Sequence, residues 1–157
     1  MKYANDVCEN FTPEIGQYLW TSTPKPLEEI QQHILTKQDQ MKSGEEIALF
    51  VLHKESLEFL GYTSINKANT STPEIGIWIK KSAHGNQYGY EALKLLKEWA
   101  EQNLDYEYMK YPVDKNNISS RKLIERLGGS IGDEYVKKSE SGNTLNTLEY
   151  RIYKQSI

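Results

Sequence analysis

The chain has 157 residues, of which 38% are hydrophobic, and a formal net charge of -3. This length falls within the usual range of one domain, so we expect residues 1–157 to form a single domain. Charges of both signs are spread throughout, which argues against nucleic acid or an anionic membrane as a partner. No apolar run approaches the ~20 residues needed to cross a bilayer. We therefore predict a soluble, cytoplasmic protein.

The sequence also argues against a metal centre. Cys8 is the only cysteine, so a cysteine-based metal site cannot be assembled within one chain. The three histidines lie far apart and lack the i, i+4 spacing that places two imidazoles on one helical face. We predict no bound metal.

Two helices are predicted near the start of the chain. Residues 1–12 are polar apart from Val7 and Phe11 and are assigned no element. Thr12 is a suitable N-cap and Pro13 a suitable first residue for a short helix that ends at Trp20. A second helix, from Leu27 to about residue 42, is indicated by apolar residues at helical spacing.

Three strands follow these helices. Residues 47–52 are continuously apolar and predict a buried strand, and residues 59–66 complete a hairpin with it. Residues 74–79 alternate between isoleucine and other residues, which is the period of a strand.

The rest of the chain alternates between helices and strands. A helix begins after Gly89, with an apolar stripe that includes Trp99, and a strand at 108–113 contains Pro112, which cannot donate to a ladder. Asn116 or Asn117 can cap a helix over 118–127, and residues 130–136 and 145–153 form a final hairpin. The pattern predicts a mixed α/β fold.

The loop from Ser82 to Gly89 is a candidate anion site. Gly85 and Gly89 allow unusual backbone angles, and successive N–H groups at a helix start can hold a phosphate. An ordinary connection between a strand and a helix explains the same residues equally well. The loop is neither a dinucleotide fingerprint nor a P-loop, because the third glycine of the former and the Gly-Lys-Ser/Thr of the latter are missing.

Two segments carry a resemblance to a known family. Residues 75–93, IGIWIKKSAHGNQYGYEAL, resemble motif A of the GNAT superfamily of acetyl-CoA-dependent N-acetyltransferases. The closest branch is that of the ribosomal-protein N-terminal acetyltransferases, with its pattern IGYWLxPxxRGKGYGTEAL. Residues 113–129, VDKNNISSRKLIERLGG, are similar to the family's next segment, whose Asn-x-x-Ser falls on Asn117 and Ser120.

The resemblance implies a GNAT-like α/β (α+β mixed) fold, in which a twisted mixed sheet is flanked by helices and its strands at 74–79 and 108–113 splay apart. The cosubstrate acetyl-CoA lies in this opening, with its pantetheine along the first of these strands and its pyrophosphate on the loop before Gly89. Pro112 stands where such a splay is expected. The coenzyme contacts implied by the resemblance are Ile77, Trp78, Ile79, His84, Gly85, Asn86, Gln87, Tyr88, Gly89, Tyr90, Asn117, Ser120 and Lys122.

The sequence departs from the family pattern at three points. His84 replaces an arginine and Gln87 replaces a glycine. A histidine is mostly uncharged near neutral pH and attracts phosphate less, and Gln87 must adopt the backbone angle that the glycine allowed. The family's first strand is short or absent, and an oligomer such as a homodimer is one way to cover the sheet edge that this leaves.

The catalytic candidates are Glu74 and Ser120. An amine acceptor is an ammonium ion at neutral pH, so a base must remove a proton. Glu74 resembles in position the strand glutamate that serves as the base in several relatives, and a solvated glutamate at a strand end is the equal alternative. Many relatives protonate the departing thiolate with a tyrosine, but Ile124 occupies that position. Ser120 is the first alternative acid, and Tyr111 and Tyr88 are weaker ones.

We expect an acyltransferase that carries an acetyl group from acetyl-CoA to a primary amine by direct transfer in a ternary complex. The acceptor is a small molecule or a protein N-terminus. A non-catalytic acyl-CoA-binding or regulatory module on the same fold is the alternative, because the usual tyrosine is missing. A nucleophilic hydrolase ranks third, because the chain has no Gly-x-Ser-x-Gly elbow.

Overall fold

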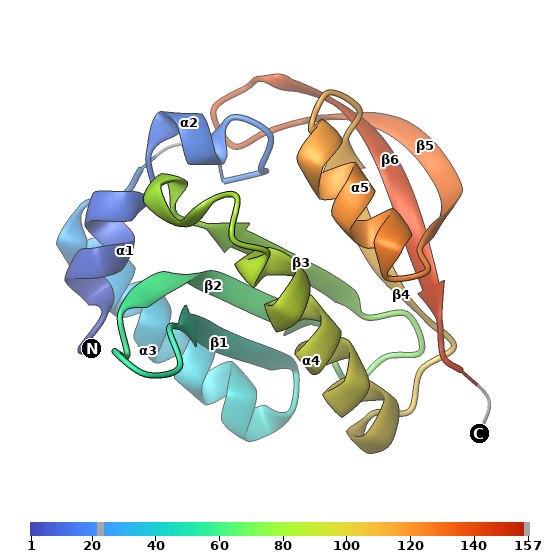
Figure 1. Cartoon of the computed structure of the whole chain (residues 1–157), viewed down its shortest axis with the longest axis horizontal. Coiled ribbons are helices and arrows are strands. Elements are labelled where there is room, and N and C mark those ends of the chain that lie inside the picture. The colour runs from blue at the N-terminus through green and yellow to red at the C-terminus, as the bar shows by residue number, and fades with distance from the viewer. Residues whose placement is uncertain (22–23, 156–157) are drawn as a thin grey trace.

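A six-stranded mixed sheet forms the centre of the molecule in the computed structural model, which describes residues 1–21 and 24–155 (Figure 1). The strands lie in the order β1-β2-β3-β4-β6-β5, and only β3 and β4 run parallel. The mixed α/β prediction is confirmed. The strands are β1 (Glu46–Leu52), β2 (Phe59–Asn66), β3 (Glu74–Ile79), β4 (Tyr108–Asp114), β5 (Ser130–Lys138) and β6 (Thr144–Tyr153).

Helices cover both faces of the sheet. Helices α4 and α5 lie on one face, and α1 and α3 lie on the other (Figure 1). A single 3-10 turn, η1 (Lys81–Ala83), precedes α4. The helices are α1 (Ala4–Asn10), α2 (Pro13–Gly16), α3 (Leu27–Ser43), α4 (Tyr88–Asn103) and α5 (Ile118–Arg126).

The start of the chain differs from the prediction. Residues 4–10 form α1, which the sequence pattern did not indicate, and the helix predicted to reach Trp20 ends at Gly16. Thr12 caps α2 as expected, because its hydroxyl accepts a hydrogen bond from the N–H of Ile15 at 3.3 Å. Contacts with the rest of the fold explain α1: the ring of Tyr3, its N-cap residue, packs edge-on against Phe50, with ring centroids 5.5 Å apart.

The sheet opens between β3 and β4. These strands pair at one position only, Glu74 opposite Lys110, where the N–H of Lys110 donates to the Pro73 carbonyl at 2.8 Å. Backbone groups of alternate residues point the same way along a strand, so residue 112 also faces β3. Pro112 has no N–H to donate there, whereas on its other side β4 pairs with β6 from Tyr108 to Asp114. The predicted splay is confirmed.

β1 lies at an edge of the sheet, and no strand precedes it within residues 1–21 and 24–45. This agrees with the expectation of a short or absent first strand. The prediction that residues 47–52 are buried was wrong, because an edge strand has a neighbour on one side only. Leu49, for example, is 41% exposed.

The core lies between the sheet and the helices α4 and α5, which cover one of its faces. Leu93 of α4, Ile124 of α5 and Met109 of β4 are completely buried there. Trp99, which was expected in the inward stripe of α4, is 40% exposed. This core holds both helices in place against the strands that diverge beneath them.

Candidate functional site

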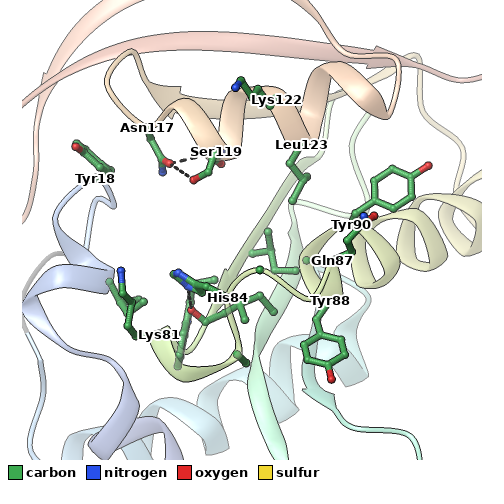
Figure 2. A pocket seen from close by; sticks show the side chains of 18 of the residues that line it. Tyr18, Lys81, His84, Gln87, Tyr88, Tyr90, Asn117, Ser119, Lys122 and Leu123 are labelled. Atoms are coloured by element: carbon green, nitrogen blue, oxygen red, sulfur yellow. Dashed lines mark hydrogen bonds between the residues drawn. The ribbon is translucent and has the colours of Figure 1, made fainter.

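A cavity of about 540 Å³ occupies the opening between β3 and β4. Its walls come from β3, the loop before α4, the first turn of α4, the segment around α2, and α5. Figure 2 shows Lys81 and His84 on one side of this cavity and Asn117 and Ser119, at the start of α5, facing them across it.

The loop before α4 has the geometry of an anion site. Gly85 has a φ of +82° and Gln87, the N-cap of α4, a φ of +63°. Gln87 thus adopts the left-handed backbone that favours glycine, as expected from its place in the motif. The N–H of Glu91 bonds to the Gln87 carbonyl at 3.0 Å, so the N–H groups of the preceding residues lack partners within the helix. They give the start of α4 a partial positive charge.

All but one of the predicted coenzyme contacts line this cavity. The exception is Asn86, whose side-chain amide donates to the carbonyls of Ala83 and His84, both at 3.2 Å. Asn86 therefore shapes the loop rather than facing the cavity. The predicted residues that line it are Ile77, Trp78, Ile79, His84, Gly85, Gln87, Tyr88, Gly89, Tyr90, Asn117, Ser120 and Lys122.

The backbone of alternate residues of β3 faces the opening. The Pro73 carbonyl points toward β4, where it accepts from Lys110. By the alternation of a strand, the N–H and carbonyl of Ile77 point the same way, whereas those of Trp78 point toward β2. Of Ile77 and Trp78, two of the coenzyme contacts that the resemblance implies, only Ile77 thus directs its backbone N–H into the opening.

His84 holds the end of β3 through one of its two ring nitrogens. Its Nε2 lies 2.7 Å from the Ile79 carbonyl oxygen, and since a carbonyl only accepts, this nitrogen donates. Fixed charge in the cavity comes from Lys81, Lys122 and Arg126. Lys81 forms an ion pair with Glu14 at 2.7 Å, which partly neutralises it.

Arg126 was not predicted from the sequence. Its Nη1 donates to Oε1 of Gln87 at 2.7 Å, and its guanidinium lies 3.7 Å from the centre of the Tyr90 ring. These two contacts hold a permanent positive charge at the start of α4, although Arg126 lies at the end of α5. Arg126 was missed because its place at the site depends on a tertiary contact with Gln87, which lies 39 residues away in the sequence.

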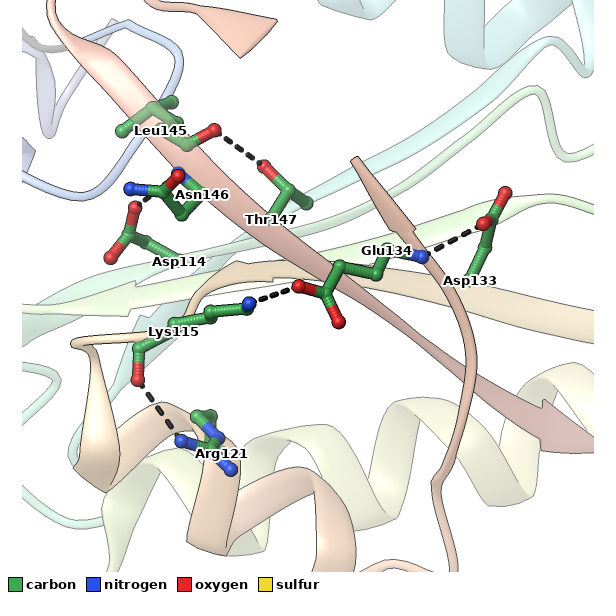
Figure 3. A network of polar contacts seen from close by, with 8 residues as sticks. All are labelled: Asp114, Lys115, Arg121, Asp133, Glu134, Leu145, Asn146 and Thr147. Atoms are coloured by element: carbon green, nitrogen blue, oxygen red, sulfur yellow. Dashed lines mark hydrogen bonds and ion pairs between the residues drawn. The ribbon is translucent and has the colours of Figure 1, made fainter. Parts of the chain in front are cut away.

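The start of α5 is fixed by a buried carboxylate. Figure 3 shows Asp114 at the end of β4, next to Asn146 of β6. Asp114 is 4% exposed and accepts the N–H groups of Asn116 at 2.9 Å and of Asn146 at 2.8 Å. The next turn then places Asn117, whose Oδ1 accepts the N–H of Ser120 at 3.3 Å and caps α5. Asn117 and Ser120 owe their positions to this turn.

The same figure shows the outer side of the turn. Lys115 forms an ion pair with Glu134 of β5, and its carbonyl accepts from Nη1 of Arg121 at 3.1 Å. Both contacts tie the segment before α5 to its surroundings.

Ser120 forms a hydroxyl pair with Tyr111. The two oxygens lie 2.6 Å apart, and Ser120 lines the cavity. Burial raises the pKa of Tyr111, and the hydrogen bond with Ser120 opposes this shift. The tyrosine therefore stays protonated at neutral pH. Ile124, at the family's usual tyrosine position, is completely buried in the core.

The ring of Tyr88 points away from α5 (Figure 2). Its centroid lies 6.1 Å from that of His53, in the turn after β1. Of the two weaker candidates for the acid, only Tyr111 thus lies beside Ser120.

Glu74 lines a second cavity, of about 910 Å³, on the opposite face of the sheet. Side chains alternate along β3, so Glu74 faces this cavity while its neighbour Ile75 is buried on the α4 side. The structure gives no hydrogen bond or ion pair to the Glu74 carboxylate within the described residues. Ile77 and Trp78 line both cavities, so the two cavities meet at the opening of the sheet.

None of the helices within the described residues has the length and apolar character required to cross a membrane. In the same part of the chain, no group of three or more His, Cys, Asp or Glu side chains is arranged to hold a metal ion.

A model of the acetyltransferase (GNAT) domain family matches residues 2–130, which is most of the chain. The chain belongs to the GNAT acetyltransferase family. It is therefore an acyltransferase, and the family resemblance seen in residues 75–93 and 113–129 is confirmed. No curated protein sequence gives a significant match.

Solved structures of other GNAT proteins share the fold. Spermidine N-acetyltransferase from Vibrio cholerae, in complex with CoA and spermine, has a TM-score of 0.83 at 13% identity, over 98% of this chain and 90% of that one. RimL, a ribosomal L7/L12 alpha-N-protein acetyltransferase in complex with coenzyme A, has a TM-score of 0.83 at 14% identity, over 97% and 89%. The microcin C7 self-immunity acetyltransferase MccE, in complex with acetyl-CoA and AMP, has a TM-score of 0.81 at 17% identity, over 97% and 87%. RimL represents the ribosomal-protein branch that the motif resembles.

Proposed function

We propose that this GNAT protein is an N-acetyltransferase that moves an acetyl group from acetyl-CoA to a primary amine by direct transfer in a ternary complex. The observation that carries the proposal is the meeting of two cavities at Ile77 and Trp78. One cavity has groups suited to a phosphorylated coenzyme, and the other contains the unpaired carboxylate of Glu74. Two substrates can meet there without a covalent enzyme adduct.

The residues of the first cavity fit coenzyme A. The N–H groups at the start of α4, with Lys122 and Arg126 beside them, suit its phosphates. The backbone of Ile77 suits an extended amide chain that adds to the free edge of β3. When bound, acetyl-CoA supplies the activated acetyl group. The structural neighbours from Vibrio cholerae, RimL and MccE, which hold CoA or acetyl-CoA, support this assignment.

Three groups of this chain serve the transfer. Glu74 takes a proton from the amine, directly or through a water, because an alkylammonium with a pKa near 10.4 is not a nucleophile at pH 7. The N–H of Ile77 is the donor available to a carbonyl oxygen in the opening. The Ser120 hydroxyl, supported by the neutral Tyr111 hydroxyl 2.6 Å away, is the proton donor available to a departing sulfur.

The experiment measures acetyl-CoA binding by calorimetry and thiol release with a panel of amines. Glu74→Gln should lower kcat at pH 7 by about 10²–10⁴-fold, the usual contribution of a general base. The Kd for acetyl-CoA should stay unchanged, because Glu74 lines the other cavity. Glu98→Gln, an exposed carboxylate of α4 paired with Lys94, is the matched control and should retain full activity. No binding of acetyl-CoA at millimolar concentration would refute the proposal.

A second function has one specific observation in its favour. Ile124 is buried where many GNAT enzymes carry their acid, so a non-catalytic acyl-CoA-binding module is the alternative. Tight acetyl-CoA binding without thiol release for any amine would support this alternative. Thiol release that is lost in Glu74→Gln would exclude it.

A further inference from the structure

The floor of the second cavity is a grid of three rows across β1, β2 and β3. Residues opposite each other in neighbouring strands share a face of the sheet, and each row takes one residue from each strand. Strands rise about 3.3 Å per residue, so rows two residues apart lie about 7 Å from each other and the outer rows about 13 Å. The side chains of these rows decide what the cavity can hold.

The first row is polar and consists of Glu46, Asn66 and Glu74. Glu46 is 4% exposed and forms an ion pair with Lys37 of α3 at 2.5 Å. Its Oε1 is buried without a hydrogen-bond partner within the described residues. Glu74 carries no partner, as described above. Burial and the nearby Glu46 carboxylate raise the pKa of Tyr62, so the Tyr62 hydroxyl of the third row lies near Glu46. The oxygens without a donor at this end are Oε1 of Glu46 and the Glu74 carboxylate, and a buried acceptor is costly unless a donor reaches it.

The middle row is small and consists of Ala48, Ser64 and Gly76. A Cβ added to Gly76 would meet no atom within 4 Å, and its φ lies outside the left-handed region. Neither close packing nor backbone strain thus requires a glycine at this position. A glycine within a strand normally weakens it. The effect of Gly76 is to keep the centre of the cavity floor open.

The third row is aromatic and consists of Phe50, Tyr62 and Trp78. Phe50 and Tyr62 contact each other edge-on, with centroids 6.4 Å apart, and Phe11 packs edge-on against Trp78 at 5.2 Å. Trp20, which is 55% exposed, also lines the cavity. This end offers a large apolar surface.

We infer that the second cavity binds the acceptor as a compact monoamine, with its ammonium at the polar row and its aromatic or aliphatic body over Gly76 and the aromatic row. The inference rests on the proposed function and specifies its acceptor. The ammonium end lies beside Glu74, where β3 and β4 meet. The floor suits one ammonium rather than several, because Lys37 neutralises Glu46 and the other two rows carry no charged side chain. Of the carboxylates in the walls, Glu140 is paired with Lys25, and Glu29 has no ion pair within the described residues. Gly76 is then a residue that determines specificity by leaving space.

The test measures, by calorimetry and by protein NMR, the binding of 2-phenylethylamine to the full chain without coenzyme. The wild type should bind it, with the signals of Gly76 and Trp78 perturbed, and should bind spermidine and a tripeptide with a free N-terminal serine at least tenfold more weakly. Gly76→Ala and Gly76→Val should weaken 2-phenylethylamine binding in that order, with the valine costing about tenfold or more, equal to ~1.4 kcal/mol.

Acetyl-CoA binding separates this test from that of the proposed function. Gly76→Val should leave the Kd for acetyl-CoA unchanged, because Gly76 does not line the first cavity. Thr144→Val, which places the same valine at an exposed position of β6 in exchange for a side chain of equal size, should change neither affinity. The inference is overturned if Gly76→Val leaves amine affinity unchanged, if 2-phenylethylamine does not bind, or if spermidine or the peptide binds more tightly. If the wild type binds 2-phenylethylamine as expected but does not bind acetyl-CoA, the result counts against the proposed function and not against this inference.

Discussion

Arg126 brings to the start of α4 a positive charge that the loop itself does not provide. His84 occupies the motif position of an arginine, and its Nε2 is committed to the Ile79 carbonyl. The guanidinium of Arg126 approaches the same helix end from α5 and is held by Gln87 and the Tyr90 ring. Gln87 and Arg126 are thus best understood together, because the residue that replaces the motif glycine also positions the arginine.

Arg126→Gln should weaken coenzyme A binding. Hydrogen bonds to charged groups contribute about 1.5–3 kcal/mol, which corresponds to roughly 10- to 150-fold in Kd. Titration calorimetry with coenzyme A at two salt concentrations measures the effect, and the salt dependence of binding should decrease in the variant. Lys94→Gln makes the same charge change on the exposed side of α4 and should have little effect. Equal losses in both variants would show that only net charge matters.

The hydroxyls of Tyr111 and Ser120 form a second pair of side chains that act together, because they are hydrogen-bonded to each other. The raised pKa of Tyr111 keeps its proton on at every pH near neutrality. Its contribution to stability is therefore complete below the ordinary value of 10.0 and is lost only as pH rises through the higher folded value. A pH dependence of stability near pH 7 must come from other groups.

At the scale of elements, Asp114 determines where α5 begins. Its two carboxylate oxygens accept backbone N–H groups from the turn and from β6, so it joins three segments. An amide in its place keeps one acceptor and adds donors that face other donors. The start of α5, with its cap at Asn117, then loses one of its supports.

Asp114→Asn should destabilise the fold by about 1.5–3 kcal/mol, the range for hydrogen bonds to a charged group. For a chain of this size, that lowers Tm by roughly 3–12 °C. Thermal unfolding followed by circular dichroism measures it. Asp39→Asn, an exposed aspartate of α3 paired with Lys42, serves as control and should change Tm by no more than ~1–2 °C. An unchanged Tm in Asp114→Asn would show that water replaces these bonds.

Most elements followed from the sequence because their signals are local. The alternation of residues 74–79, the cap at Asn117 and the stop at Gly128, with its φ of +89°, act within a few residues. Helix α1 was missed because residues 4–10 carry no helical stripe. Its order comes from aromatic contacts of the adjoining Tyr3 with Phe50 and Phe59, which are distant in sequence.

The residues of the candidate site that could be predicted are likewise those with a local sequence signal. The loop residues and Ile77 belong to one continuous motif, so they were found together. Arg126 and Tyr18 reach the cavity from other segments, and no local pattern marks them. No local pattern showed either that Glu74 and Ser120 line different cavities, because this depends on which face of the sheet each side chain takes in the fold.

At the scale of the molecule, the sheet consists of two halves. β1, β2 and β3 form one ladder and β4, β6 and β5 another, and one residue pair joins them. The first cavity has walls from both halves, since β3 and the α4 loop belong to one and α5 to the other. β1 remains an open edge, and a homodimer that covers it stays a prediction.

A ligand that contacts both halves should stabilise the whole fold. Coenzyme A at about 100 times its Kd should add ~2.7 kcal/mol, which raises Tm by roughly 5–11 °C. Differential scanning calorimetry with and without coenzyme A checks the shift. Hydrogen exchange should show new protection in both the α4 loop and the start of α5. Protection limited to the α4 loop would contradict binding across the opening.

The single pair between Glu74 and Lys110 also has a consequence for how the chain opens and closes. Separating β3 from β4 breaks few backbone hydrogen bonds, whereas unfolding within either half breaks a complete ladder. The halves are therefore joined by the common core of side chains from both, and by α4 in the chain, rather than by a backbone ladder. A coenzyme bound between them, as proposed, would supply backbone contacts that the two strands do not make with each other.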